Sequence, residues 1–184
     1  MDQCSFFVGQ NVGVLEQGID LLASIDDETY VMNGHLYFGS GIGRHFRHIL
    51  DHYQCMLCRT EKRIDYDARE RDERLETDRK FSMVAAEGIV EELKGLGQTE
   101  PPLVAATSLH VNSNEGENPE KVSPWTGSTL ERELQYLLSH TVHHYALIAM
   151  MLKILGKTPP KDFGVAPSTI QYERSLEKRS SASM

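Results

Sequence analysis

The sequence has little of what marks secreted or membrane proteins. Its 184 residues hold three cysteines, an odd number and too few for the disulfide framework of a small secreted domain. The longest apolar run, residues 145–152, is far shorter than the roughly 20 residues of a membrane-spanning helix. No basic segment followed by a long apolar one comes after Met1, so no signal peptide is expected. We therefore expect a cytoplasmic protein without a membrane partner.

Positive charge is also scarce. Lys and Arg number 19 against 27 Asp and Glu, which gives a formal net charge of −8. Such a chain repels the phosphate backbone of DNA and RNA, so no nucleic-acid partner is expected. Hydrophobic residues make up 40% of the sequence, and the length suits one compact domain with a core of its own.

Apolar residues recur at steps of three and four over four segments, which is the spacing of an amphipathic helix. The segments cover residues 8–22, 40–57, 81–95 and 128–155. Four long amphipathic helices are typical of a four-helix bundle. The sequence therefore predicts an all-α fold.

Several residues mark where the predicted helices begin and end. Ser40 is suited to cap the second helix. Ser128 and Glu131 have the spacing of a capping box at the start of the last helix. Gly156 is suited to the position just after that helix, where a left-handed backbone is common.

Prolines and a polar stretch interrupt the helical pattern over residues 98–127. We expect a long crossover here, with a β-hairpin built from strands at residues 103–111 and 121–125. The bundle domain is expected to span residues 1–160. Residues 161–184 are expected to form a C-terminal extension, partly disordered, with a short helix.

Histidines are the residues that most directly suggest a function. The chain has eight, and six of them fall on the second and fourth predicted helices, as His45, His48 and His52 and as His140, His143 and His144. Two histidines four residues apart lie on one face of a helix and can bind one metal ion. The two clusters therefore predict a metal site between the helices.

The orientation of the second cluster follows from about 100° of rotation per residue. Relative to the centre of the apolar stripe, His144 lies at about 40°, His140 at about 80° and His143 at about 140°. We therefore expect His140 and His144 to face inward together and His143 to face outward.

A catalytic metal site of this kind usually has three protein ligands and an open position. The second helix can supply the third ligand from His45, His48 or His52, which share one side of it. Periodicity favours His45 or His52, because both lie nearer the centre of the apolar face. The spacing alone leaves the third ligand open.

Three stretches of the sequence, residues 43–53, 65–72 and 128–145, carry a resemblance to a known family. The most specific part is Ser139-His140-Thr141-Val142-His143-His144-Tyr145. Over residues 5–156 the chain resembles the DinB/YfiT-like superfamily of four-helix metalloproteins.

The resemblance implies an up-up-down-down four-helix bundle that forms a homodimer and holds one divalent metal ion with three histidines. One ligand comes from the second helix in a His-x-x-Asp context, which matches His48 and Asp51. The other two come from a pair four residues apart on the last bundle helix, which matches His140 and His144. The resemblance therefore selects His48 over its two neighbours.

Members of this superfamily include transferases that use a low-molecular-weight thiol, such as bacillithiol or mycothiol, as cosubstrate. Our leading hypothesis is therefore a metal-dependent enzyme that transfers a thiol to a small electrophilic substrate. The alternatives are a metal-dependent hydrolase and a non-catalytic metal- or ligand-binding bundle. Imidazole ligands suit zinc, nickel and iron alike, so the metal is not specified.

Two further roles near the site stay open in the sequence. His45, His52 and His143 are all candidates for a proton acceptor, so no catalytic residue is assigned. Cys55 or one of the extra histidines could close a structural metal site as a fourth ligand. The mixed charges of residues 65–72 favour a network of surface ion pairs, and the alternative is a loop ordered beside the histidines.

Overall fold

The structure is a computed structural model that describes residues 3–32, 40–59, 61–96, 107–112 and 124–181. Within these ranges the chain is mostly helical and carries a small three-stranded sheet, so the all-α prediction is confirmed in its coarse form. The helices are α1 (Gln3–Ser24), α2 (Asp27–Val31), α3 (Ile42–Leu57), α4 (Arg74–Thr77), α5 (Arg79–Leu96), α6 (Leu130–Ile154) and α7 (Pro167–Ser181). The strands are β1 (Arg63–Asp65), β2 (Ser108–Asn112) and β3 (Thr126–Thr129).

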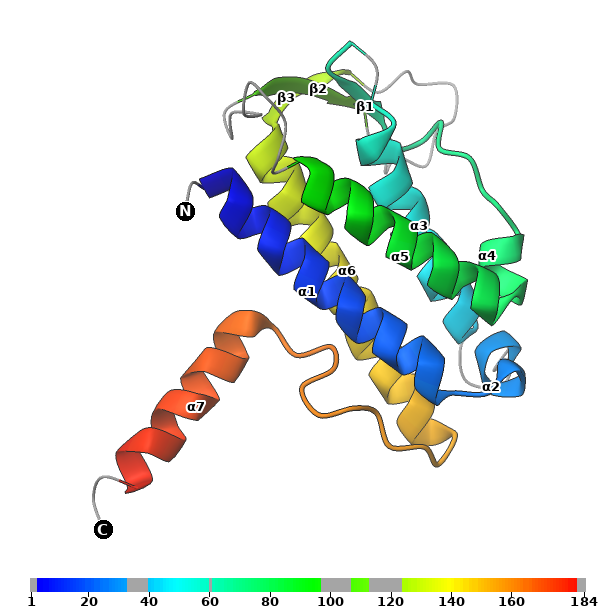
Figure 1. The fold of residues 1–184 in the computed structure, drawn as a ribbon, viewed down its shortest axis with the longest axis vertical. Helices are drawn as coiled ribbons and strands as arrows, with labels where there is room; N and C mark the ends of the chain where they lie inside the picture. Colours follow the sequence, from blue (N-terminus) through cyan, green and yellow to red (C-terminus); the bar gives the residue numbers. More distant parts are fainter. Residues whose placement is uncertain (1–2, 33–39, 60, 97–106, 113–123, 182–184) are drawn as a thin grey trace.

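Four long helices, α1, α3, α5 and α6, lie side by side and enclose the core (Figure 1). Both α1 and α3 pack against α5 and α6. Their apolar stripes meet in the middle, where Leu15, Phe46, Leu93 and Leu134 are at most 1% exposed. Helices α3 and α6, which carry the two histidine clusters, are therefore direct neighbours.

The helix directions correct the up-up-down-down prediction. Along α1 and α6, Asn11 bonds the carbonyl of Leu134, and Gly18 lies against Tyr145 further on, so these two helices run the same way. Helix α3 runs against them, because His45 lies opposite His144 and the later His48 lies opposite the earlier His140. Helix α5 also runs against α1, because its first residue Arg79 bonds the carbonyl of Leu22 near the end of α1. The order is therefore up, down, down, up.

The order of helix directions depends on which connection between the long helices runs the length of the molecule. The sequence predicted the long crossover at residues 98–127, between the third and fourth long helices. In the structure the chain instead returns along the helices over residues 61–78, between α3 and α5 (Figure 1). Because α5 then ends beside the sheet, where α6 begins, the last connection reverses the chain direction.

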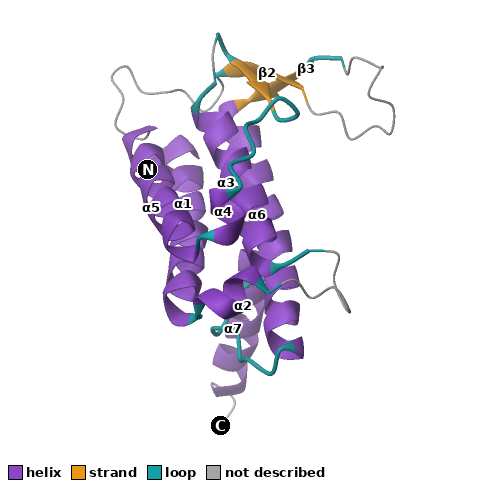
Figure 2. Cartoon of the chain, turned by 90° about the vertical axis from the view of Figure 1, so that its right-hand side faces the viewer, coloured by secondary structure: helices purple, strands orange, loops and turns teal. Residues whose placement is uncertain are grey.

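The sheet caps the end of the helices where α3 stops and α6 starts (Figure 2). Strands β2 and β3 are antiparallel, with Ser108 opposite Thr129, as the predicted hairpin requires. The second strand begins at Thr126, one residue beyond the predicted segment. Residues 103–106 and 121–123 of the predicted hairpin lie outside the described residues. Strand β1, which pairs with β2 in parallel, was not predicted.

Two predicted helix starts are each displaced by one residue. The N-cap of α6 is Thr129, whose hydroxyl accepts a hydrogen bond from the Arg132 amide at 3.2 Å. Ser128 instead donates its hydroxyl to the buried Glu133 carboxylate, so it does not form the predicted capping box. The N-cap of α3 is Gly41 without a side-chain bond, and Ser40 points to a histidine instead.

The end of α6 is as predicted. Gly156 has a positive φ of 72°, a conformation that favours glycine. Its amide bonds the carbonyl of Lys153, and the Lys157 amide bonds that of Leu152, at 3.0 and 2.8 Å. This pair of bonds is a Schellman motif, which satisfies carbonyls that the helix end leaves unpaired.

After α6 the chain turns back onto that helix before α7 begins. Phe163 is 5% exposed and stacks on Tyr145 with ring centroids 4.5 Å apart. Helix α7 then extends away from the other helices, and it includes the short helix expected in the C-terminal extension (Figure 1). The domain division at residue 160 stays a prediction. Within the described ranges, every helix is too short or too polar to span a lipid bilayer.

Candidate metal centre

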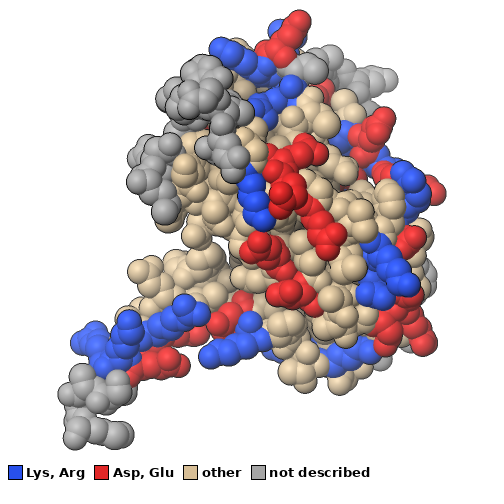
Figure 3. All heavy atoms as spheres, in the orientation of Figure 1, with Lys and Arg blue, Asp and Glu red and all other residues tan. Residues whose placement is uncertain are grey.

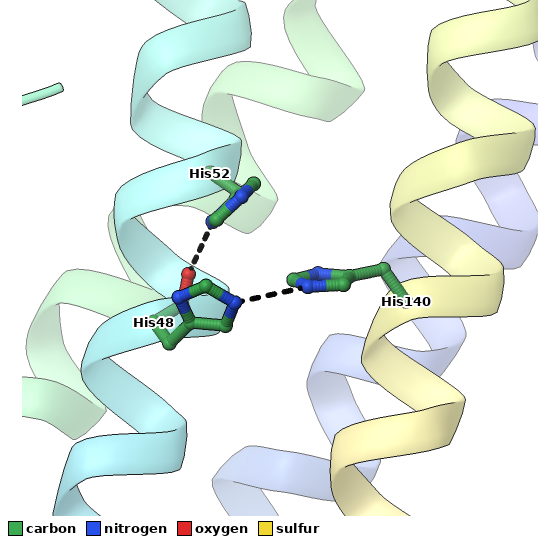
Figure 4. A group of neighbouring side chains, drawn as sticks. All are labelled: His48, His52 and His140. Atoms are coloured by element: carbon green, nitrogen blue, oxygen red, sulfur yellow. Dashed lines mark hydrogen bonds between the residues drawn. The ribbon is translucent and has the colours of Figure 1, made fainter. Parts of the chain in front are cut away.

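The antiparallel packing of α3 and α6 brings the two histidine clusters face to face. His48 lies opposite His140, with their Nε2 atoms 3.1 Å apart (Figure 4). His140 also has its Nε2 3.1 Å from Nε2 of His144, one turn further along α6. All three residues named by the resemblance are therefore brought together at one point between the helices.

These short nitrogen–nitrogen distances fit a shared cation better than hydrogen bonds. The Nε2 atom of His140 carries either one proton or one lone pair, yet it faces two other nitrogens. Two imidazole nitrogens bound to one tetrahedral zinc ion lie about 3.3 Å apart, given Zn–N bonds of about 2.0–2.1 Å. The chemistry of the donors fits a divalent metal, and the contacts of His140 with His48 and with His144 each have the spacing of two ligands on one ion.

A second row of polar groups lies behind His144. Nδ1 of His45 is 2.8 Å from Nδ1 of His144, and Nε2 of His45 is 3.0 Å from the hydroxyl of Ser40. One assignment of protons satisfies both contacts: His144 donates from Nδ1 to His45, and His45 donates from Nε2 to Ser40. This assignment leaves the Nε2 lone pair of His144 directed at His140, as a metal ligand requires.

His52 forms a second, overlapping group with two of the same residues. His48, His52 and His140 each offer a ligand atom, and these atoms lie within 4.8 Å of one another. Nδ1 of His52 donates to the backbone carbonyl of His48 at 2.7 Å, which leaves its Nε2 lone pair available (Figure 4). His48 and His140 therefore belong to both groups, and His144 and His52 compete for the third place.

Burial keeps the four central histidines neutral. Loss of hydration lowers the pKa of His48 to about 2, of His144 to about 3 and of His140 and His52 to about 4. Mutual repulsion among the imidazolium forms lowers the pKa of His48, His140 and His144 further. At neutral pH all four rings therefore carry lone pairs and no net charge.

Two tyrosines form an aromatic wall beside the histidines. Tyr66 stacks on His52 with centroids 5.3 Å apart, and Tyr136 stacks on His140 at 5.4 Å. The Tyr66 hydroxyl donates to the buried Glu133 carboxylate at 2.9 Å. The sequence alone did not indicate these two tyrosines, because Tyr66 lies in an irregular segment and Tyr136 adds nothing to the spacing of the histidines.

Other residues considered in the sequence take different places. His143 is exposed, as its angle on α6 predicted. The Cys55 thiol donates to the backbone carbonyl of Asp65 at 3.1 Å, and burial raises the pKa of this thiol to about 11. This contact directs the thiol to Asp65 of β1. Asp51 is 3% exposed, and no hydrogen bond from the described residues reaches its Oδ1 atom.

A cavity of about 350 Å³ opens beside the histidines. His48 and His144 form part of its wall, so a small molecule inside it can reach the candidate metal site. Its remaining lining comes from Ser40, Arg44, His45, Arg47, Asp51, Arg69 and Arg71. Two of these, Arg69 and Arg71, belong to the mixed-charge segment 65–72, so part of this segment lies beside the site and is not only a network of surface ion pairs.

Fold and site together define a helical protein with a candidate histidine metal centre between two of its helices. The sequence model of the DinB family matches residues 5–175, nearly the whole chain. The chain therefore belongs to the DinB family.

One curated relative is FK506-binding protein 5 from Rhizopus delemar, which is 31% identical over 112 residues. The match covers 59% of this chain and 27% of that protein. The chain thus spans about a quarter of the relative's length, and the name describes the relative only. No solved structure matches the chain.

Proposed function

We propose that this protein is a metal-dependent enzyme that transfers a low-molecular-weight thiol to a small electrophilic substrate. The observation that carries the proposal is the position of His140, whose Nε2 lies 3.1 Å from Nε2 of both His48 and His144. Membership of the DinB family and the cavity that reaches two of these histidines support it.

We assign the ligands as His48, His140 and His144. Two facts favour His144 over His52 as the third ligand. The Nε2 atoms of His144 and His140 lie 3.1 Å apart, which is close to the separation of two ligands on one ion. In addition, His144 has the hydrogen-bonded partner His45 behind it, a feature that metal-binding histidines usually share.

The protein's own residues would prepare the site for a thiol. Three neutral imidazoles leave one position open to a substrate, and the aromatic rings of Tyr66 and Tyr136 exclude water from one side. A divalent ion bound here would favour the thiolate form of a coordinated thiol. His45 is placed to accept a proton from His144 or to hold its ring in place, since Ser40 fixes the other nitrogen.

Two alternatives use the same site. A metal-dependent hydrolase would activate water at the open position in place of a thiol. A non-catalytic metal-binding protein would close that position with a fourth protein ligand, and His52 is the residue that favours this case. The identity of the fourth ligand therefore separates an enzyme from a structural or storage protein.

The first test is the metal content of protein purified without a metal-affinity tag. We expect one divalent ion per chain in the wild type, and its loss in His48→Ala, His140→Ala and His144→Ala. His143→Ala is the matched control, because this exposed histidine is on the same helix. Retention of metal in His144→Ala with loss in His52→Ala would move the third ligand to His52.

The thiol step is tested separately on the metal-loaded protein. Thiol consumption with a small electrophile should require the metal and disappear in His140→Ala. Metal binding without any thiol consumption would favour the alternatives. A low-molecular-weight thiol as cosubstrate and a homodimer stay predictions of the family resemblance, and a cytoplasmic location stays a prediction of the sequence composition.

A further inference from the structure

The cavity beside the histidines differs in charge from the rest of the molecule. The chain has a net charge of −8, and acidic side chains gather on the face formed by α1 and α5 (Figure 3). The cavity, in contrast, is lined by four arginines, Arg44, Arg47, Arg69 and Arg71, and by one carboxylate. Its wall therefore keeps a positive charge even when Asp51 is ionised.

Other groups of the protein satisfy the charge and the hydrogen-bond donors of these arginines only in part. Arg47 pairs with Glu76 at 2.8 Å, and this contact neutralises it. Arg69 donates from Nη1 to the carbonyl of Tyr66 at 2.5 Å, but its Nε atom is buried without a hydrogen-bond partner in the described part of the chain. A buried donor without a partner is costly, so a ligand that accepts from it would be favoured.

Arg44 and Arg71 complete the positive side of the cavity. Both are exposed, and neither has an ion pair among the residues that the structure describes. They come from different elements, since Arg44 is in the first turn of α3 and Arg71 is in the return segment before α4. Two guanidinium groups that converge from separate segments on one cavity suit an oxyanion, which accepts several hydrogen bonds at once.

We infer that this cavity binds a small molecule through a carboxylate or phosphate group, held by Arg44, Arg69 and Arg71. The inference rests on the proposed function and extends it to the chemical class of the substrate. The anionic group would lie at the arginines, and the rest of the molecule would extend toward His48 and His144 on the same wall. A volume of about 350 Å³ suits a small metabolite.

The oxyanion can be tested without any assumption about the reaction. The full chain, labelled with ¹⁵N, is titrated with succinate, with inorganic phosphate and with neutral succinamide at one ionic strength. The signal of the Arg69 Nε–H group reports binding at the buried donor. The titrations are made on the protein as purified and on the same protein after chelation of any metal. Comparison of the two shows whether binding of the anion requires the metal.

The variant is Arg44→Gln/Arg71→Gln, and the control is Arg132→Gln, an exposed arginine on the wall of a different cavity. We expect succinate, phosphate or both to shift the Arg69 signal, and succinamide not to shift it. Affinity should fall about tenfold or more in the double variant, since charged hydrogen bonds are lost, and stay within about twofold in the control.

The inference is overturned if neither anion binds, if succinamide binds equally well, or if the control weakens binding as much as the double variant. A response to succinate alone supports a carboxylate, and a response to phosphate alone supports a phosphate. Failure of the metal proposal has a different signature. In that case the anion still binds, but the wild type holds no metal.

Discussion

His45 lies directly behind His144, with their Nδ1 atoms 2.8 Å apart. The two residues are on different helices, so this contact links the position of α3 to the orientation of a candidate metal ligand on α6. The Ser40 hydroxyl in turn lies 3.0 Å from Nε2, the other ring nitrogen of His45. In the proposed site, His45 is therefore a positioning residue behind His144, one of the three proposed ligands.

This arrangement predicts that His45→Ala weakens metal binding without changing its stoichiometry. Loss of a hydrogen-bonded partner behind a metal ligand typically reduces affinity by about 10- to 100-fold. Titration of the metal-free protein with zinc against a chelator of known affinity measures the change. His143→Ala should leave the affinity unchanged. A stoichiometry that falls to zero in His45→Ala would instead make His45 a ligand.

The metal-free protein should become less stable as the pH falls from about 7 toward 4. The pKa of His48 is about 2 and that of His140 about 4 in the folded state, against an ordinary value of 6.5. Below pH 6.5 the unfolded chain takes up protons that the folded protein does not, so unfolding is favoured. Added zinc should oppose unfolding at neutral pH, because it binds the folded state.

Urea unfolding at several pH values measures this dependence. The loss of stability between pH 7 and pH 4 should be smaller in His48→Ala than in the wild type, because one buried histidine has been removed. An equal loss in both proteins would show that His48 is not kept neutral by burial.

A buried hydrogen-bond network in the core makes a separate prediction. The Tyr53 hydroxyl donates to Oδ1 of Asn11 at 2.6 Å and accepts from Thr141 at 3.3 Å, so that α1, α3 and α6 are joined. Tyr53→Phe leaves the buried Asn11 Oδ1 without its donor and should lower the free energy of unfolding by about 1–3 kcal/mol. Tyr172→Phe, at a tyrosine that is 63% exposed, should change it by less than about 0.5 kcal/mol. Equal effects in urea unfolding would contradict the role given to the network.

Gly43 is predicted to be essential for the packing of α4 on α3. A Cβ atom at this position would lie 2.0 Å from the backbone oxygen of Glu76. Gly43→Ala should therefore lower the free energy of unfolding by about 1–3 kcal/mol, because one helix must move. Gly88→Ala is the matched control, since that helical glycine has no atom within 4 Å of the added methyl group. It should raise stability by about 0.5–1 kcal/mol, and thermal unfolding of both variants measures the contrast.

Much of the fold could be predicted, since the long helices follow from local periodicity. Gly156 ends α6 as its sequence position indicated, and the antiparallel pairing of β2 and β3 was also expected. The helix directions could not be obtained in this way. They depend on whether residues 61–78 or residues 98–127 run the length of the molecule, and composition does not distinguish two polar connections.

The site was predictable to a similar degree. Spacing on the helices placed His140 on the inner side of α6 and His143 outside. The spacing also predicted that His45 and His52 are more buried than His48, and the structure agrees. The residue that contacts His140 is nevertheless His48. Burial along one helix reports distance from the core, whereas a metal site needs atoms that meet across two helices. Arg69 could not be placed, because its segment has no regular pattern.

The most direct test of the account is X-ray absorption spectroscopy of the purified, metal-loaded protein. We predict a single divalent ion with three imidazole nitrogens at about 2.0–2.1 Å if the ion is zinc, and a further ligand that a small thiol displaces. The number of imidazole nitrogens should fall by one in His144→Ala. A spectrum without imidazole scattering, or a wild type that takes up no divalent metal, would contradict the central claim.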